Sequence, residues 1–210
     1  MEIEKLLECN EELPGITEWI ISESMTSFDY RGDSHPNFKN LPHGTCRMIF
    51  PGGEIFIGNT SLGQLVNGVM IFPEKGFYIG SFQNGKRNGN GVYVSDKMHY
   101  NGTFRDDSMC GNGTLTGKHG SYNGEFFDHE RHGFGTLVCT NGNSFIGFFE
   151  RDKKQGRGQI VKSSGEIYEC TFENDSIVGP VTYTPLTGRE TIIKDPDEIK
   201  EIESMVDCDF

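Results

Sequence analysis

Two short fragments of the sequence have residue types that occur in chemical sites, and neither has the spacing that the chemistry requires. The first is His129-Glu130-Arg131-His132, with two imidazoles and a carboxylate that are possible metal ligands. The zinc-protease motif H-E-x-x-H places its two histidines four residues apart on one helical face. Here the histidines are three residues apart in a predicted hairpin turn, where side chains point in divergent directions. We therefore expect turn residues in solvent and no metal site.

The second fragment runs from Gly111 to Lys118 and imitates a phosphate-binding loop. A P-loop needs the spacing G-x-x-x-x-G-K-[ST] between a strand and a helix. That spacing is absent, His119 replaces the Ser or Thr, and the surrounding pattern is that of a hairpin. The other G-x-G elements open no helix either, and no Ser/His/Asp or Cys/His grouping can be read from the spacing. We expect a protein that is not an enzyme and that has no cofactor.

The elements that carry these fragments are predicted hairpins. In residues 100–120, Tyr100, Gly102 and Phe104 alternate with polar residues, and after a polar break glycines and a leucine alternate in the same way. Period-2 alternation is typical of a strand with one buried face. A glycine leaves a gap on that inner face, which an aromatic ring from a neighbouring strand can fill. The unit recurs with lead aromatics at positions 56, 78, 100, 122, 145 and 168. A fixed period of this length indicates a solenoid-type repeat protein.

The recurring pattern Y-x-G-x-F-x-x-G-x-x-x-G-x-G resembles the MORN repeat over residues 44–183, apart from a mid-turn glycine that is replaced by Asp107, His129 and Asp152. The resemblance implies an all-β fold: an elongated, twisted, single-layer antiparallel sheet of successive hairpins. We expect a solenoid over residues 28–183, with a degenerate first repeat at 28–54 and repeats that start near the six lead aromatics.

Short capping segments are expected at both ends. Residues 1–27 contain an acidic helix pattern and the apolar stretch Ile16–Ile21, which either caps the first edge of the sheet or binds a partner. Residues 184–210 contain a linker and an acidic amphipathic helix that starts at Asp195-Pro196, an N-cap followed by proline. Residues 28–46 also have weak similarity to the MORN-bearing region of SET-domain lysine methyltransferases. The chain after residue 183 is too short for a SET domain, so we do not transfer that activity.

Composition excludes some classes of protein. The net charge is −12, and most of it lies in residues 1–25 and 188–210, while the repeats are nearly neutral. A nucleic-acid binder would have a basic field, so we expect no nucleic acid. No apolar run is long enough to cross a membrane. The six cysteines are scattered with no C-x-x-C pair, which favours free thiols in the cytoplasm.

Basic residues recur at the predicted hairpin turns and would form a loose stripe along one edge. Acidic residues in the same turns cancel much of their field. Since some MORN proteins are associated with acidic phospholipids, contact with an acidic membrane surface is one possible function. We call these residues the turn-edge cations: Lys86, Arg87, Arg131, Lys153, Lys154 and Arg157.

Four apolar residues stand at positions where the alternation predicts the opposite, outer face: Phe134, Val138, Ile146 and Phe148. We call them the outer patch. An apolar patch on a polar face usually marks a contact surface. Either the C-terminal helix covers it, or it is a groove for a helix or peptide of a partner protein.

We predict a non-catalytic scaffold or adaptor whose sheet face binds a partner protein through the outer patch. The alternatives are a peripheral adaptor for acidic membranes and a regulatory subunit or degenerate relative of a MORN-bearing enzyme. MORN proteins of cilia and the cytoskeleton are known, but no residue here selects that setting.

Overall fold

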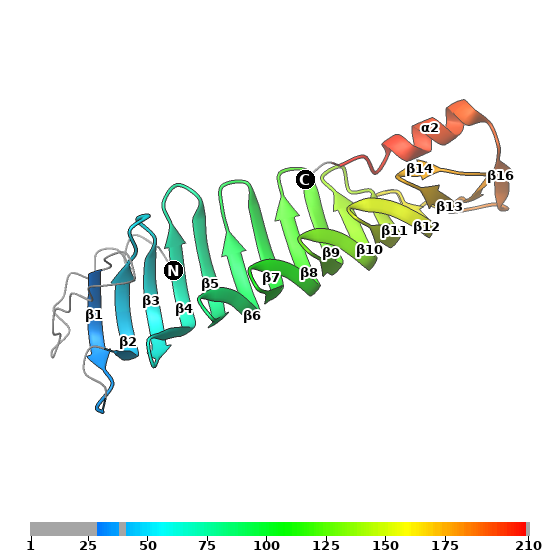
Figure 1. The fold of residues 1–210 in the computed structure, drawn as a ribbon. Helices are drawn as coiled ribbons and strands as arrows, with labels where there is room; N and C mark the ends of the chain where they lie inside the picture. Colours follow the sequence, from blue (N-terminus) through cyan, green and yellow to red (C-terminus); the bar gives the residue numbers. More distant parts are fainter. Residues whose placement is uncertain (1–28, 38–40, 209–210) are drawn as a thin grey trace. The chain divides into compact units, whose positions relative to one another are not determined.

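The computed structural model describes residues 29–37 and 41–208, and these residues form sixteen strands and one helix (Figure 1). Every strand pairing among them is antiparallel, so the predicted all-β fold of hairpins is confirmed. The predicted helix and apolar cap in residues 1–27 lie outside the described residues. The chain divides into two units, residues 1–85 and 86–210.

The first unit has five strands in sequence order. The first two strands pair with each other, with Asp29 opposite Ile49 and Tyr30 opposite Met48. The strands are β1 (Asp29–Ser34), β2 (Pro42–Ile49), β3 (Ile55–Ser61), β4 (Gln64–Phe72) and β5 (Gly76–Gln83).

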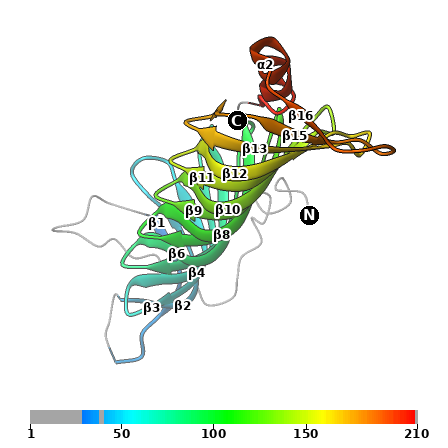
Figure 2. The ribbon, with the colours of Figure 1, turned by 90° about the vertical axis from the view of Figure 1, so that its right-hand side faces the viewer.

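The second unit continues the same hairpin pattern and ends in a helix. Its strands are β6 (Lys86–Val94), β7 (Met98–Arg105), β8 (Ser108–Gly117), β9 (Gly120–Phe127), β10 (Glu130–Cys139), β11 (Ser144–Glu150), β12 (Lys153–Val161), β13 (Ile167–Glu173), β14 (Ser176–Ile177), β15 (Val181–Thr184) and β16 (Thr191–Ile193). β13 pairs with both β14 and β15. The helix, α2 (Pro196–Ser204), lies next to the last strands and contacts β14 (Figures 1 and 2).

The inner face of the sheet is built from aromatic rings that lie over glycines. A Cβ atom added to Gly113 would come within 2.6 Å of the Tyr100 ring, so that ring occupies the space above the glycine. The Tyr100 hydroxyl donates a hydrogen bond to the backbone carbonyl of Thr103, at 3.1 Å. The ring also meets Phe104 and Phe126 edge-on, each at 5.1 Å between centroids. Because burial disfavours the charged form, it raises the pKa of Tyr100 to about 12.

The tight turns between paired strands explain the residues that replace the mid-turn glycine. Asp106 and Asp107 both have positive φ, at 48° and 75°, as a two-residue type I′ turn requires. Asp128-His129 and Arg151-Asp152 repeat this geometry. Asp and Asn tolerate the left-handed region better than most residues. The turn type therefore persists without glycine.

The C-terminal helix begins as predicted. The Asp195 side chain accepts hydrogen bonds from the amides of Asp197 and Glu198, and Pro196 occupies the first turn. Ile202 and Val206 are buried, with 3% and 0% of their surface exposed. These two aliphatic side chains attach the helix and the residues that follow it to the sheet.

Candidate functional site

The register of the strands defines an equivalent outer-face position in each pairing between neighbouring hairpins. Five of these pairings place polar or charged residues opposite one another: Thr45–Asn59, Asn67–Ser81, Asn90–Thr103, Asn112–Glu125 and Arg157–Thr171. In two of them the side chains bond directly: the Thr45 hydroxyl donates to the Asn59 side-chain oxygen at 3.1 Å, and the Thr103 hydroxyl donates to the Asn90 side-chain oxygen at 3.3 Å. This outer-face position is therefore polar in both units.

The sixth pairing departs from this pattern. Phe134 on β10 lies directly opposite Phe148 on β11, and their rings meet edge-on at 5.4 Å. The two side chains remain 49% and 52% exposed. Val138 and Ile146 lie on the same face of these strands, so the structure brings the four predicted outer-patch residues together on β10 and β11.

A hollow of about 500 Å³ adjoins the outer patch on the same face. Phe134 and Ile146 form its apolar side, and the backbone of Gly147 and Gly158 lies between them and the polar side. The polar side is formed by a set of hydrogen-bonding and charged side chains: Arg157, Gln159, Glu169, Thr171 and Thr182. The Gln159 amide donates to the Glu169 carboxylate at 2.9 Å. The site thus combines an exposed aromatic pair with a polar groove that has one cation and one anion.

The family model for the MORN repeat matches residues 78–97, 100–121, 122–144 and 145–167. Residues 78–167 are four MORN repeats. The match covers the lead aromatics at 78, 100, 122 and 145 but not those at 56 and 168, and it includes all four residues of the outer patch. No curated protein matches the chain.

The basic residues at the turns have a structural role between successive MORN repeats. The Arg131 guanidinium and backbone amide both donate to the Asp152 carboxylate, at 3.0 and 2.9 Å, and the guanidinium also donates to the Asp152 carbonyl. Arg87 makes the same three hydrogen bonds with Asp107. The Arg131 guanidinium also lies 5.2 Å from the centroid of the Phe149 ring. We call this arrangement the turn clasp.

The turn clasp alters the interpretation of the turn-edge cations. The side chains of Arg87 and Arg131 are only 19% and 15% exposed, and Lys154 is buried beside Asp175, at 3.8 Å. Their charges are directed at carboxylates of the next turn. Lys86, Lys153 and Arg157 are exposed. The structure therefore leaves only these three of the six predicted cations at the surface.

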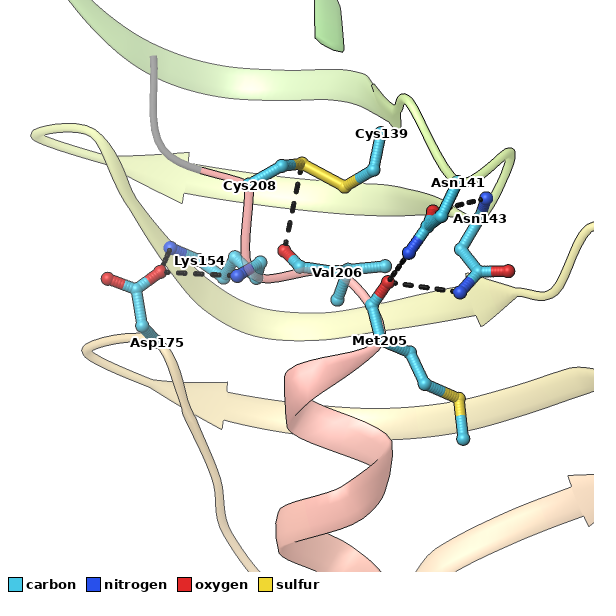
Figure 3. The surroundings of a disulfide bond; sticks show 8 residues. All are labelled: Cys139, Asn141, Asn143, Lys154, Asp175, Met205, Val206 and Cys208. Atoms are coloured by element: carbon cyan, nitrogen blue, oxygen red, sulfur yellow. Dashed lines mark hydrogen bonds and ion pairs between the residues drawn. A yellow bond between two sulfur atoms is a disulfide. The ribbon is translucent and has the colours of Figure 1, made fainter. Parts of the chain in front are cut away.

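The residues that follow the C-terminal helix lie against the end of β10, where Cys208 meets Cys139 (Figure 3). Cys139 is two residues from Leu137 on β10, so both side chains lie on the inner face. Cys139 forms a disulfide with Cys208. The side-chain amides of Asn141 and Asn143 both donate to the carbonyl of Met205, at 3.2 and 3.1 Å. The alternative in which the C-terminal helix covers the outer patch is therefore wrong.

The disulfide also corrects the expectation that the cysteines are free thiols. Cys139 and Cys208 are 69 residues apart, and only the return of the C-terminal segment to the β10–β11 turn brings them together. Cys46, Cys110 and Cys170 are free. Burial raises the pKa of the Cys170 thiol to about 12 and that of Cys46 to about 11.

The prediction of turn residues in solvent holds for His129 but not for His132, which lies in β10 and is half-buried. His129 is exposed with positive φ, and the His132 ring packs 5.8 Å from Phe127. Within residues 29–37 and 41–208, no group of three or more His, Cys, Asp or Glu side chains is placed to hold a metal ion. Across the same described ranges, no helix has both the length and the apolar character that a membrane crossing needs.

Sequence reasoning missed the turn clasp, although the sequence contains a signal for it. Arg87 precedes Asp107 by 20 residues, and Arg131 precedes Asp152 by 21, close to the repeat period. A basic residue and an acid that recur about one repeat apart must lie on neighbouring turns. The spacing would have identified these cations as structural.

Proposed function

We propose that the outer patch and the adjoining hollow bind a helix or peptide of a partner protein, and that the MORN repeats act as a scaffold for this contact. One observation carries the proposal: Phe134 and Phe148 occupy the cross-strand position that is polar in the five other described pairings. The scaffold does not need aromatic residues there, because the inner face supplies the packing. An exposed apolar pair on such a face favours a contact surface.

The groove indicates what kind of segment fits it. An apolar side chain of the partner would rest against Phe134 and Phe148, which present both ring faces and edges. A carboxylate or backbone carbonyl one turn away would reach Arg157, while Glu169 would accept a hydrogen bond from an amide or a base. An amphipathic helix that carries an acidic residue beside its apolar stripe meets these requirements.

The free energy that a partner would gain by burying the two rings of the outer patch is large enough for recognition. Each phenylalanine is half exposed, so complete burial would remove roughly 100 Å² of apolar surface per ring, worth about 2.5 kcal/mol. The two rings together would contribute about 5 kcal/mol before the cost of association. Screened attraction from three exposed turn cations is weaker, so we do not propose membrane binding as the main function. The cytoplasmic location remains a prediction from composition.

The test is a quantitative pull-down with the full chain, in which the Phe134→Asp, Phe148→Asp double variant is compared with wild type. Phe127→Asp is the matched control, because Phe127 is 66% exposed and lies at the end of β9, outside the outer patch. We expect a defined set of proteins to be retained by wild type and by the control at 0.5 M salt, and to be lost with the double variant. A photo-crosslinking residue at position 148 should then label the same proteins.

Two results would contradict the proposal. In the first, the control loses the same proteins as the double variant. In the second, binding to acidic vesicles survives the double variant, disappears with Lys153→Glu, and accounts for all retained material. The second result would establish membrane contact as the function instead.

A further inference from the structure

In the first unit the Phe56 ring identifies the inner face of the sheet. The ring has no exposed surface, and it lies over Gly58 and Gly68, where an added Cβ atom would come within 2.7 and 2.9 Å of it. Side chains alternate between the two faces along a strand. The residues on either side of Phe56, which are Ile55 and Ile57, therefore point to the outer face. The strand register extends this assignment to β2, β4 and β5.

Two adjacent rows of this outer face are apolar. The register places seven apolar side chains on β2 to β5 in these rows, with Ile49, Ile55, Ile71 and Phe77 in one and Ile57, Val69 and Ile79 in the other. We call these seven residues the isoleucine face. All of them are at least partly exposed, and Ile79 is 42% exposed.

The second unit shows that the repeat does not need apolar residues at these positions. The residues on either side of the lead aromatics Tyr100 and Tyr122 are all polar: His99, Asn101, Ser121 and Asn123. They pair across β8 with two threonines. In the described part of the first unit, residues 29–37 and 41–85, the only elements are β1 to β5, and they form a single layer (Figure 1). No second layer there covers the isoleucine face, and a continuous apolar surface of this kind usually marks a contact surface.

Two arginines lie at one end of the isoleucine face. Arg47 on β2 is opposite Ile57 and belongs to the second row, and Arg31 on β1 is directly opposite Arg47. Like charges at opposed positions destabilise a strand pair, so this arrangement is a cost to the fold. Within residues 29–37 and 41–208, no carboxylate forms an ion pair with either guanidinium. Two guanidinium groups without a counter-ion favour a ligand that has carboxylates at this end.

These charges distinguish between the possible ligands of the face. β2 to β5 contain no aspartate or glutamate, so a second copy that docked through the same four strands would bring no carboxylate to the arginines. A membrane would supply anionic groups. However, six of the seven apolar side chains are half-buried on a sheet, and they do not protrude as an apolar face that inserts between lipids does. A protein helix can pack on such a surface without insertion.

From the apolar rows and the two arginines, we infer that the isoleucine face binds an amphipathic helix of a partner protein, with acidic residues at one end of its apolar stripe. The rows are about 7 Å apart along the strands, and the face is about 15 Å wide from β2 to β5. A helix of about 10–12 residues has this length. Apolar residues at i, i+3, i+4 and i+7 form a stripe that covers both rows. The acidic end then lies over β1 and β2, where Arg31 and Arg47 bind its carboxylates.

The test begins with a phage library of random peptides of about 20 residues, long enough for the proposed helix. The library is selected on the full-length protein and counter-selected on the triple variant Ile57→Asn, Val69→Thr, Ile79→Asn. The second unit has these residue types at the same repeat positions, in Asn101, Thr114 and Asn123, so the variant should fold. We expect the selected peptides to share a helical apolar stripe with Asp or Glu at one end. In anisotropy titrations, a labelled synthetic copy should bind the triple variant about tenfold more weakly or worse.

A charge exchange tests the arginines. Arg31→Glu, Arg47→Glu should weaken binding of the same synthetic peptide about tenfold or more. A second peptide, in which lysine replaces each acidic residue at the charged end, should bind this variant more tightly than wild type. Lys97→Glu, Lys118→Glu is the matched control, because it changes the net charge equally at two exposed positions outside the strands. This control should bind both peptides as wild type does.

Methyl spectra of the full chain, labelled at the isoleucine δ1 methyl groups, locate the bound peptide. The signals of Ile57 and Ile79 should shift on titration, while that of Ile146 in the outer patch should not. The Phe134→Asp, Phe148→Asp double variant should bind the peptide normally. This inference and the proposed function can therefore fail independently.

Four results would overturn the inference. Selected peptides that lack acidic residues, or that bind the triple variant as tightly as wild type, would exclude the proposed helix site. A dimer of wild type that the triple variant cannot form, measured by sedimentation, would assign the face to a second copy. An increase of about tenfold in peptide affinity with Trp19→Asp would assign it to the chain's own N-terminal residues. Competition by vesicles of phosphatidylcholine and phosphatidylserine would assign it to a membrane.

Discussion

Replacing Gly102 by valine tests whether the inner glycines hold the aromatic stack in place. A Cβ atom on Gly102 would lie 2.6 Å from the Tyr100 Cζ and 2.8 Å from the Cα of Gly113. The second contact is with backbone on the neighbouring strand, so rotation of a flexible side chain cannot relieve it. The Gly102 φ is not positive, and valine is therefore not excluded by its own backbone conformation.

The cost of this substitution follows from what must move. Overpacking of this kind costs about 1–3 kcal/mol. If the Tyr100 ring tilts away, its hydrogen bond to Thr103 is lost, at about 1 kcal/mol, and its edge contacts with Phe104 and Phe126 weaken by about 0.5–1.5 kcal/mol each. The higher strand propensity of valine returns roughly 1 kcal/mol. We expect the free energy of unfolding to fall by about 3 kcal/mol.

Urea denaturation followed by far-UV circular dichroism measures this loss. Asn101→Val is the control, because Asn101 is the adjacent residue on β7 and is exposed on the outer face. It should change stability by less than about 0.5 kcal/mol. Hydrogen exchange should show that the loss in the glycine variant is centred on β7–β9, since repeat proteins need not unfold in one step.

A double-mutant cycle with Tyr100→Leu separates steric conflict from other causes. If the Tyr100 ring is the obstacle, the Gly102→Val, Tyr100→Leu double variant should lose at least 1 kcal/mol less than the sum of the single losses. Additive losses, or an equal loss from Asn101→Val, would refute the assignment of the inner face.

Three further results are expected. Asp152→Ala removes the acceptor of the Arg131 clasp and should lower the free energy of unfolding by about 1 kcal/mol in urea titrations, since the carboxylate is half exposed and its charged hydrogen bonds are partly screened; an unchanged midpoint would show that the clasp is not stabilising. Cys208→Ser removes a cross-link that the chain-entropy model values at about 4 kcal/mol for a loop of this length. Hydrogen exchange of residues 196–204 should therefore accelerate, while the central strands stay protected. Equal protection of residues 196–204 in the variant and in wild type would contradict this. Hydrogen bonds from Ser164, Tyr183 and Lys162 lower the pKa of Glu166 from 4.5 to about 2. The stability that Glu166 contributes is therefore present above pH 4.5 and is lost as the pH falls towards 2. Glu166→Gln should flatten the dependence of the free energy of unfolding on pH in this range, and an unaltered dependence would exclude a contribution of Glu166.

Most of what could be predicted follows from two patterns in the sequence. One is the repeat period, and the other is the alternation of inner-face and outer-face residues along each strand. The lead aromatics at 56, 78 and 100 predicted the hairpins because each strand must bury one face, and the glycines opposite them predicted where rings would lie. The Asp195 cap predicted where the helix begins, because capping depends on local residues alone. These features are local or repeat regularly, so one sequence is sufficient to predict them.

The contacts of the C-terminal segment could not be predicted in the same way. The pairing of Cys139 with Cys208 depends on how residues 185–195 turn the chain back towards the β10–β11 turn, and no period constrains that path. The alternation of residues along the strands predicted that Phe134 and Phe148 lie on the outer face, but it could not decide whether the helix covers that face. Only the position of Val206 and Cys208 on the inner face decides it.

The regularity of the repeats gives a reason to attach function to the positions that depart from it. Some departures have a structural explanation: Cys170 replaces the inner glycine opposite Gly158, and there Tyr168 stacks on Tyr183, at 4.9 Å, instead of lying over a pair of glycines. That substitution ends the aromatic stack where the helix begins to cover the sheet. The pair Phe134–Phe148 has no such explanation, because its rings are half exposed and the inner face beneath them is already packed. This departure, which the scaffold does not use, is the reason why we propose a partner for the outer patch.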